Sequence, residues 1–172
     1  MRQYFLAIKE ILEIFLVAFF SILLIYKFLA QPFLVKGASM EPNFKDGDYL
    51  LVDEISYRLR VPERGDVVVF RYPGDKTVFY IKRIIGLPKE EIEISGGKIA
   101  VSGRVLDENY LPAALKTDSF NNARFVLGEN QYFVLGDNRP FSSDSRRWGP
   151  VSRAEIIGEV SFRFWPRPEK FF

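Results

Sequence analysis

The 172-residue sequence predicts a mainly β domain, built as a barrel or a sandwich, that follows a single N-terminal transmembrane helix. Two observations support this prediction. A twenty-residue apolar segment lies near the start of the chain, and short β-branched and aromatic runs, separated by Gly, Pro, Asn or Asp, fill the part after Pro32. We therefore divide the chain into residues 1–32, a short tail with a membrane anchor, and residues 33–172, the β-rich domain.

The apolar segment, ILEIFLVAFFSILLIYKFLA at residues 11–30, contains only two charged side chains, Glu13 and Lys27. As a helix it would be about 30 Å long, which is enough to cross the hydrocarbon core of a bilayer. A cleavable signal peptide is one alternative, but a cut after Ala30 would put Phe28 where such sites need a small residue. A buried helix of a soluble protein is the other. The membrane anchor fits the segment best.

The β-rich domain contains seven candidate strands and few helical signals. The candidate strands are DYLLVDE, DVVVFRY, TVFYIKRIIG, EEIEI, KIAVS, ARFVL and QYFVLG. The stretch EEIEISGGKIAVSG predicts a hairpin with Gly96 and Gly97 at its tip, because paired glycines suit a tight turn. Only SRAEIIGEV and DEISYRL suggest a helical turn.

Composition excludes several kinds of site. The sequence has no Cys and no His, which excludes disulfides, thiol nucleophiles, Cys or His zinc sites and a Ser/His/Asp triad. The formal net charge is only +2 and the basic residues form no long block, so we expect no nucleic-acid partner. A serine nucleophile in this chain would need a base other than histidine, and a desolvated lysine is the main alternative.

One serine and one lysine are candidates for such a pair. Ser39 lies in VKGASMEPNF, where the ordinary interpretation is a turn serine among loop-forming residues. Lys82 lies in VFYIKRIIG, where strand alternation places it on one face with Tyr80 and Ile84. Both faces carry apolar side chains, so we expect one of the two adjacent cations, Lys82 or Arg83, to be at least partly desolvated. Burial of Lys82 would lower its pKa and make it a usable base. The alternative is a lysine that reaches solvent from an edge strand.

The polar segment GDNRPFSSDSRRWG, residues 136–149, carries further candidates. Its hydroxyl groups are suited to orienting a lysine amine, and Asp144 with Arg146 is suited to an ion pair that makes the loop rigid. The ordinary alternative is a solvated polar loop.

Taken together, these segments resemble the type I (leader) signal peptidases, serine/lysine proteases that remove signal peptides from exported proteins. After the hydrophobic anchor, the matching pieces follow in the family's order and extend over nearly the whole chain: GASMEP, GDYLLVDE, RGDVVVFRYP, YIKRIIGLP, QYFVLGDNRPFSSDSRRWG and IIGEVSFRFWP. The resemblance implies a membrane-bound serine endopeptidase that cuts after a small-x-small motif through an acyl-enzyme, without a metal or an organic cofactor.

The resemblance also assigns roles to individual residues. It makes Ser39 the nucleophile, with its backbone N–H as an oxyanion donor, and Lys82 the general base. Ser142 would orient Lys82, and Asp144 and Arg146 would support the loop. Six apolar residues would line the pockets for the small substrate side chains: Phe33, Val35, Met40, Phe44, Val69 and Ile81.

The partners implied by the resemblance are precursor proteins with signal peptides and membrane lipid, with the protein export machinery as a further candidate. The resemblance also implies a single-pass protein of the cytoplasmic (inner) membrane. Its N-terminus would be cytoplasmic and its catalytic domain would lie on the outer, periplasmic side. The charges themselves do not decide this orientation, since Lys and Arg flank the apolar segment on both sides.

Three positions depart from the family pattern. Gly37 replaces a serine that helps to bind the oxyanion in some relatives, so a second donor must come from another group. Lys89 replaces the usual glycine of the turn after IIGLP. Pro140-Phe141 replaces a more usual Asp-Asn pair and gives a stiffer, less polar loop before Ser142.

Other functions remain open at the level of sequence. A processing peptidase of the pilus or conjugation type shares the anchor, the serine and the lysine, and differs in its substrate. A self-cleaving repressor of the SOS type would need a helix-turn-helix in place of the apolar segment, and the eukaryotic secretory relatives use a histidine that this chain lacks. A non-catalytic membrane-anchored β domain is disfavoured by the joint presence of Ser39, Lys82, Ser142 and Asp144.

Overall fold

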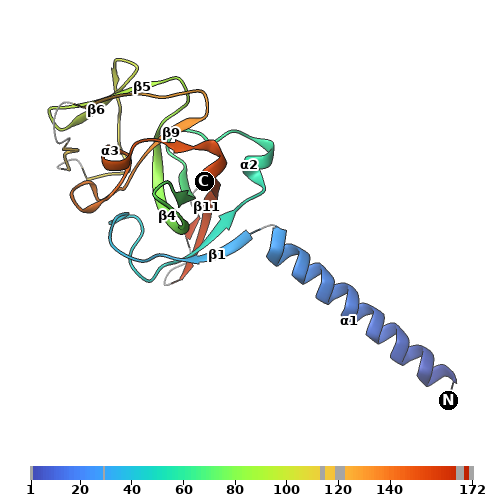
Figure 1. The fold of residues 1–172 in the computed structure, drawn as a ribbon. Coiled ribbons are helices and arrows are strands. Elements are labelled where there is room, and N and C mark those ends of the chain that lie inside the picture. Colours follow the sequence, from blue (N-terminus) through green and yellow to red (C-terminus); the bar gives the residue numbers. More distant parts are fainter. Residues whose placement is uncertain (1, 29, 113–114, 119–122, 166–168, 171–172) are drawn as a thin grey trace.

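The computed structural model describes residues 2–28, 30–112, 115–118, 123–165 and 169–170. It shows a β-rich body from which one long helix, α1, extends (Figure 1). The helical elements are α1 (Arg2–Phe28), α2 (Ser56–Leu59), η1 (Arg139–Phe141), α3 (Ser145–Trp148) and η2 (Arg153–Glu155). The strands are β1 (Ala30–Leu34), β2 (Tyr49–Asp53), β3 (Val67–Tyr72), β4 (Asp75–Gly86), β5 (Glu91–Ser95), β6 (Lys98–Val101), β7 (Arg104–Val105), β8 (Ala123–Val126), β9 (Gln131–Leu135), β10 (Val151–Ser152), β11 (Ile156–Trp165) and β12 (Glu169–Lys170).

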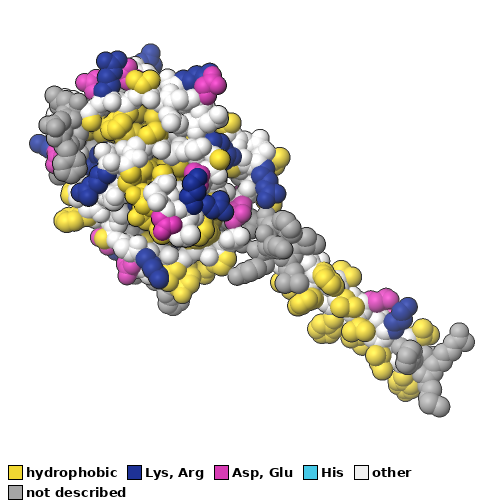
Figure 2. Space-filling model, viewed as in Figure 1, with side chains coloured by type: hydrophobic (Ala, Val, Ile, Leu, Met, Phe, Trp, Pro, Cys, Tyr) yellow, Lys and Arg dark blue, Asp and Glu magenta, His cyan; other side chains and the backbone are white. Residues whose placement is uncertain are grey.

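The N-terminal helix α1 presents apolar side chains to its surroundings. The side chains described in α1 are exposed, among them Phe15, which is 70% exposed, and Val17, which is 67% exposed. Figure 2 shows apolar atoms along the length of this helix. Over the residues searched, no helix is both long enough and apolar enough to span a membrane. The helix ends at Phe28 and β1 begins at Ala30, so the sheet starts slightly before the boundary expected at residue 33.

The larger sheet has the strand order β1-β2-β11-β3-β4-β9-β10, with β12 paired to β11, and its neighbouring strands are antiparallel. The apolar residues at the start of β3 are explained by burial on both of its faces. Val67 and Val69 pack into one apolar cluster, whereas Val68 and Phe70 pack into another. Because side chains alternate between the faces of a strand, both faces of the sheet are buried here.

The smaller sheet, in the order β7-β6-β5-β8, is inserted in the chain between β4 and β9. The predicted hairpin is confirmed: β5 and β6 pair, and Gly96 and Gly97 form the turn with positive φ angles of 59° and 79°. A third apolar cluster fixes this sheet to the larger one. It contains Ile92, Ile94 and Ile99 from the small sheet and Phe133 and Leu135 from β9.

The two predicted helical signals have different outcomes. DEISYRL contains α2, and at the start of this helix Ile55 N and Ser56 N donate hydrogen bonds to Asp53 Oδ1. SRAEIIGEV forms only the short turn η2, and the chain from Ile156 onward is strand β11. The predicted helical turn is thus limited to Arg153–Glu155, because from Ile156 onward β11 pairs with β2 on one side and with β3 on the other, and this pairing overrides the local pattern.

Candidate active site

Ser39 lies in a tight turn that follows β1 and is held from two directions. Within the turn, Glu41 N donates to Ala38 O across 3.2 Å. From the loop after β9, Asn138 N donates to Ser39 O and Asn138 Nδ2 donates to Ala38 O, both across 3.0 Å. The next residue, Met40, is fully buried and anchors the turn in the apolar core. The Ser39 side chain is therefore presented from a fixed backbone.

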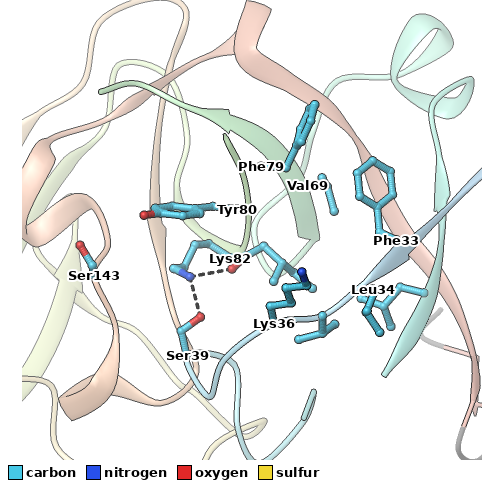
Figure 3. A pocket seen from close by; sticks show the side chains of 12 residues that line it. Phe33, Leu34, Lys36, Ser39, Val69, Phe79, Tyr80, Lys82 and Ser143 are labelled. Carbon is cyan, nitrogen blue, oxygen red and sulfur yellow. Dashed lines mark hydrogen bonds between the residues drawn. The ribbon is translucent and has the colours of Figure 1, made fainter. Parts of the chain in front are cut away.

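Lys82 projects from β4 toward that turn. It is only 3% exposed, and its Nζ lies 2.7 Å from Ser39 Oγ and 2.8 Å from Ile81 O. Figure 3 shows both contacts and the Tyr80 ring beside the amine; the ring centroid is 5.3 Å from Nζ. The structure thus brings together the serine and the lysine that the sequence singled out.

The surroundings of Lys82 favour its neutral form. Burial of the amine lowers the pKa of Lys82 from its ordinary value to about 8, because an ammonium group loses hydration in the protein interior. The carboxylates of Asp144 and Asp137 act in the opposite direction and raise this pKa, so they limit the fall. A minor part of Lys82, about a tenth at pH 7, is therefore already the neutral amine that can act as a base, and this part grows as the pH rises through 8.

The loop behind the serine and the lysine is held by an ion pair. Arg146 Nε donates to Asp144 Oδ1 and Arg146 Nη2 donates to Asp144 Oδ2, each across 2.8 Å. Asp144 is fully buried, caps the start of α3 and also accepts a 3.1 Å hydrogen bond from Gly136 N. Arg146 donates a further hydrogen bond to Arg139 O across 2.6 Å. This geometry can make the loop rigid, as the sequence interpretation expects of Asp144 and Arg146.

Ser142 lies beside the nucleophile turn, but its hydroxyl makes no hydrogen bond within the described part of the chain. Ser142 is 6% exposed. The resemblance predicts that this hydroxyl orients the Lys82 amine. In the structure the amine instead contacts Ile81 O and Ser39 Oγ. A β-carbon built at Gly136 would lie 2.2 Å from Ser142 Oγ and 2.4 Å from Ser39 O, so only glycine lets the two segments approach this closely.

A second group of polar residues at the site was not anticipated as a set. Arg83, the neighbour of Lys82, donates to both carboxylate oxygens of Asp137 across 2.9 and 2.7 Å. Asn43, from the nucleophile turn, donates to Asp137 across 2.8 Å and to Tyr110 O across 3.0 Å. These contacts join the lysine strand, the serine turn and the loop after β9. Two sequence signals pointed to members of this group, the adjacency of Arg83 to Lys82 and the place of Asp137 in the polar segment 136–149.

A cavity of about 320 Å³ adjoins the serine and the lysine. Of the six predicted pocket residues, four line it, and Met40 and Phe44 do not; those two are fully buried in the apolar core. The remaining lining residues were not predicted as pocket residues. The full lining is Phe33, Leu34, Val35, Lys36, Ser39, Leu50, Val69, Phe79, Tyr80, Ile81, Lys82 and Ser143.

Comparison with known proteins gives consistent matches. The family model described as signal peptidase, peptidase S26, matches residues 8–165. Probable signal peptidase I-2 of Synechocystis sp. is 42% identical over 147 residues, which cover 82% of this chain and 66% of that protein, just under two thirds of its length. Signal peptidase IB of Staphylococcus aureus is 38% identical over 94% of this chain and 93% of its own length. The crystal structure of a signal peptidase I from Enterococcus faecalis matches with a TM-score of 0.50 and 36% identity, over 59% of this chain and 97% of that one.

Proposed function

Since the chain belongs to the signal peptidase family, peptidase S26, and is a serine endopeptidase that removes signal peptides, we propose that Ser39 and Lys82 carry out its reaction. The observation that supports this assignment is the 2.7 Å contact between Lys82 Nζ and Ser39 Oγ at a buried amine. Geometry of this kind allows direct proton transfer between a base and a nucleophile.

The proposed reaction is acyl transfer. Neutral Lys82 takes the Ser39 proton as Oγ bonds to the carbonyl carbon of the residue before the cut. The peptide C–N bond then breaks, the Lys82 ammonium gives its proton to the leaving amine, and the signal peptide stays on Ser39 as an ester. Water, deprotonated by Lys82, cleaves that ester and restores the hydroxyl. In this scheme each proton passes between Ser39, Lys82, the substrate and water.

The oxyanion formed in each step needs hydrogen-bond donors. The proposal takes the Ser39 backbone N–H as the first donor. Gly37 offers no side chain, and its backbone N–H already donates to Asp46 Oδ1 across 2.7 Å. The second donor must therefore be another group or a water molecule.

The cavity supports binding of an extended chain with small side chains. Its apolar part is lined by Phe33, Val35, Val69 and Ile81. Strand β1 has β2 as its only paired neighbour among the described residues, so its other edge is open. Strand β4 pairs with β9 only from Arg83 onward, so the edge of β4 before Arg83 is also open. Two open strand edges thus border the cavity, and a peptide can add to such edges through backbone hydrogen bonds.

For α1 the proposal is a membrane anchor with a cytoplasmic N-terminus and the catalytic domain on the opposite, outer side. The support is the exposed apolar surface of a helix of 27 residues, a length of about 40 Å. An anchored protease would meet precursors whose own apolar segment lies in the same bilayer at high effective concentration. Membrane lipid and, for precursor delivery, the export machinery are its proposed partners.

The test is cleavage of a precursor with a small-x-small site by the full chain in liposomes. We expect cleavage after the second small residue by the wild type, and none by Ser39→Ala or Lys82→Met. The control is Lys98→Met, which removes an exposed lysine on the small sheet and should leave the rate unchanged. Cleavage by Ser39→Ala at the wild-type rate would overturn the assignment. Folded wild type that cuts only pilin-type precursors would point to the alternative substrate class.

A further inference from the structure

Lys36 is a charged residue of the catalytic cavity that the proposed reaction does not use. It lies three positions before Ser39, is exposed, and lines the cavity together with the apolar residues. Figure 3 shows its side chain between Ser39 and Leu34, with the amine turned into the cavity. Among the described residues Lys36 makes no ion pair and no side-chain hydrogen bond, so its amine is available to a charge on a bound chain.

The walls of this cavity carry cations and no carboxylate. Of its described lining residues only Lys36 and Lys82 are charged. The carboxylate of Asp46 accepts a hydrogen bond from Gly37 N across 2.7 Å and does not line the cavity. A charged substrate side chain that reaches Lys36 therefore meets a positive wall, which attracts an acid and repels a base.

The backbone around Lys36 continues the open edge of β1. Val35 N donates to Asp48 O across 2.9 Å and Val35 O accepts from Gly47 N across 3.0 Å, so both polar groups of Val35 face the β2 side. Successive residues of an extended chain turn their N–H and C=O groups to opposite edges. Those of Lys36 therefore face the edge to which a substrate would add.

Side-chain alternation decides which substrate residue meets Lys36. Val35 is buried, whereas Leu34 and Lys36 are exposed, so Lys36 lies on the face of the strand opposite to Val35. Added as a strand, a small-x-small segment turns its two small side chains toward the apolar face that Phe33 and Val35 share. The x side chain then lies on the face of Lys36.

The distances allow this contact. The substrate carbonyl that reacts must lie at Ser39 Oγ, and the three residues from Lys36 to Ser39 span at most about 10 Å. Lys36 is therefore level with the residues just before the cut. Side chains that are directly opposite on neighbouring strands have β-carbons about 5 Å apart, a separation that the long side chain of a lysine bridges.

We propose that Lys36 is a specificity-determining residue that favours precursors with Asp or Glu at x, the residue between the two small ones. Its ammonium group pairs with that carboxylate in the bound substrate and disfavours Lys or Arg at the same position. This inference rests on the proposed function and names a subclass of its substrates. Because Lys36 takes no part in the bond changes, its contribution falls mainly on KM.

The experiment compares three precursors that differ only at x, which is Asp, Gln or Lys. The full chain cleaves them at pH 9 in liposomes of zwitterionic lipid, which keeps lipid charge out of the comparison. Most Lys82 is neutral at this pH, since its pKa is about 8, so its own charge contributes little. We expect kcat/KM to fall in the order Asp, Gln, Lys by about twofold at each step, the size of a partly solvated ion-pair effect. Salt raised from about 0.05 M to about 0.5 M should weaken the preference, because it screens exposed charges.

Charge reversal at Lys36 is the decisive variant. Lys36→Glu should reverse the order of the three precursors, and Lys36→Gln should make their kcat/KM values equal. Each ratio compares two substrates of one enzyme, so an effect of the substitution on folding or on the Lys82 base cancels. The control is Lys98→Glu, which makes the same change in net charge at an exposed position on the small sheet and should keep the wild-type order.

Three outcomes would overturn the inference. They are equal cleavage of the three precursors by the wild type, a preference that Lys36→Glu leaves unchanged or that Lys98→Glu also reverses, and a preference that high salt does not weaken. The proposed function is checked separately, because the precursor with Gln at x must be cleaved by the wild type and left intact by Ser39→Ala. Failure of that cleavage would count against the proposed function and not against the role of Lys36.

Discussion

Lys82 Nζ and Ser39 Oγ lie 2.7 Å apart although 43 positions separate the two residues in the chain, and the lysine that makes this contact is only 3% exposed. Burial therefore has two effects at one atom. It removes water from a cationic group, which opposes folding, and it lowers the pKa of that group, which supplies a base.

The first prediction concerns the pH dependence of activity. Because burial lowers the pKa of Lys82 to about 8, kcat/KM should rise with pH and reach half its plateau near pH 8. Initial rates on a synthetic precursor between pH 6 and 10 measure this rise, the acid limb of the pH profile. A limb that stays in place in a Lys82→Arg enzyme with residual activity would assign the titration to another group.

Removal of the Asp144 charge should move this limb. The Asp144 carboxylate raises the pKa of Lys82, so Asp144→Asn should lower that pKa and shift the acid limb to lower pH. The rate itself should also fall, because Asp144 caps α3 and pairs with Arg146, so the midpoint of the profile is the quantity to compare. Glu93→Gln, which removes an exposed carboxylate on the small sheet, should leave the midpoint where it is.

Stability should respond to pH through the same lysine. The pKa of Lys82 is about 8 when folded and 10.5 for an unperturbed side chain, so between these values the unfolded chain binds more protons and stability rises with pH. Below pH 8 the folded state carries a buried cation at a cost of up to about 3 kcal/mol. We expect Lys82→Met to be more stable than wild type at pH 7, by about 1–3 kcal/mol, and the difference to shrink toward pH 10.5. Thermal unfolding in detergent at several pH values measures it, and a constant difference would contradict the pKa assignment.

Gly136→Ala should inactivate the enzyme without unfolding it. An added β-carbon would lie 2.4 Å from Ser39 O and 2.2 Å from Ser142 Oγ, so the two segments must move apart. A shift of about 1 Å at a nucleophile can cost about 100-fold in rate, which is the loss expected in kcat. The control is Gly128→Ala, whose added β-carbon meets only the side chain of Gln131, at 3.2 Å. Full activity of Gly136→Ala would show that the loop has room that the structure does not indicate.

Lys89 is a position where a substitution should stabilise the protein. Its φ angle is +69°, in the region that glycine adopts without steric cost, and its ion pair with Glu129 is exposed at both ends. Lys89→Gly should therefore raise the free energy of unfolding by about 0.5–1 kcal/mol. Lys98→Gly, at an exposed position within β6, should instead lower it by a similar amount. A rise in both variants, measured by urea unfolding, would contradict the argument from φ.

Local chemistry explains what the sequence could predict. The Gly96-Gly97 turn requires positive φ angles, so the hairpin follows from two adjacent residues. Alternation along an apolar strand indicated that Lys82 or Arg83 would be desolvated, and Lys82 is only 3% exposed. The Ser39 turn and the loop that contains Asp144 were identified by motifs in a fixed order. For the hairpin and the lysine strand a short stretch contains the information, whereas the serine turn and the Asp144 loop were recognised through the resemblance to a known family.

Other features depend on partners that are distant in the chain. Asn43 and Asp137 form a hydrogen bond across 94 positions, and Arg83 reaches Asp137 across 54. No local pattern indicates which amide will meet which carboxylate, so this part of the site could not be predicted. The strand β11 is similar, because its pairing partners lie about 100 residues earlier, and its own sequence at Ile156 suggested a helical turn.

The insertion of the small sheet between β4 and β9 has a consequence for the evolution of this fold. These two strands are neighbours, and Lys89 N donates to Gly128 O where the inserted segment begins and ends. A short turn could therefore replace the whole small sheet without a change in the strand order of the larger one. Yet Ile85, Phe133 and Leu135, each at most 1% exposed, pack against the inserted strands. A lineage that shortened this segment would convert them into an aggregation-prone surface unless it also replaced those side chains with polar ones.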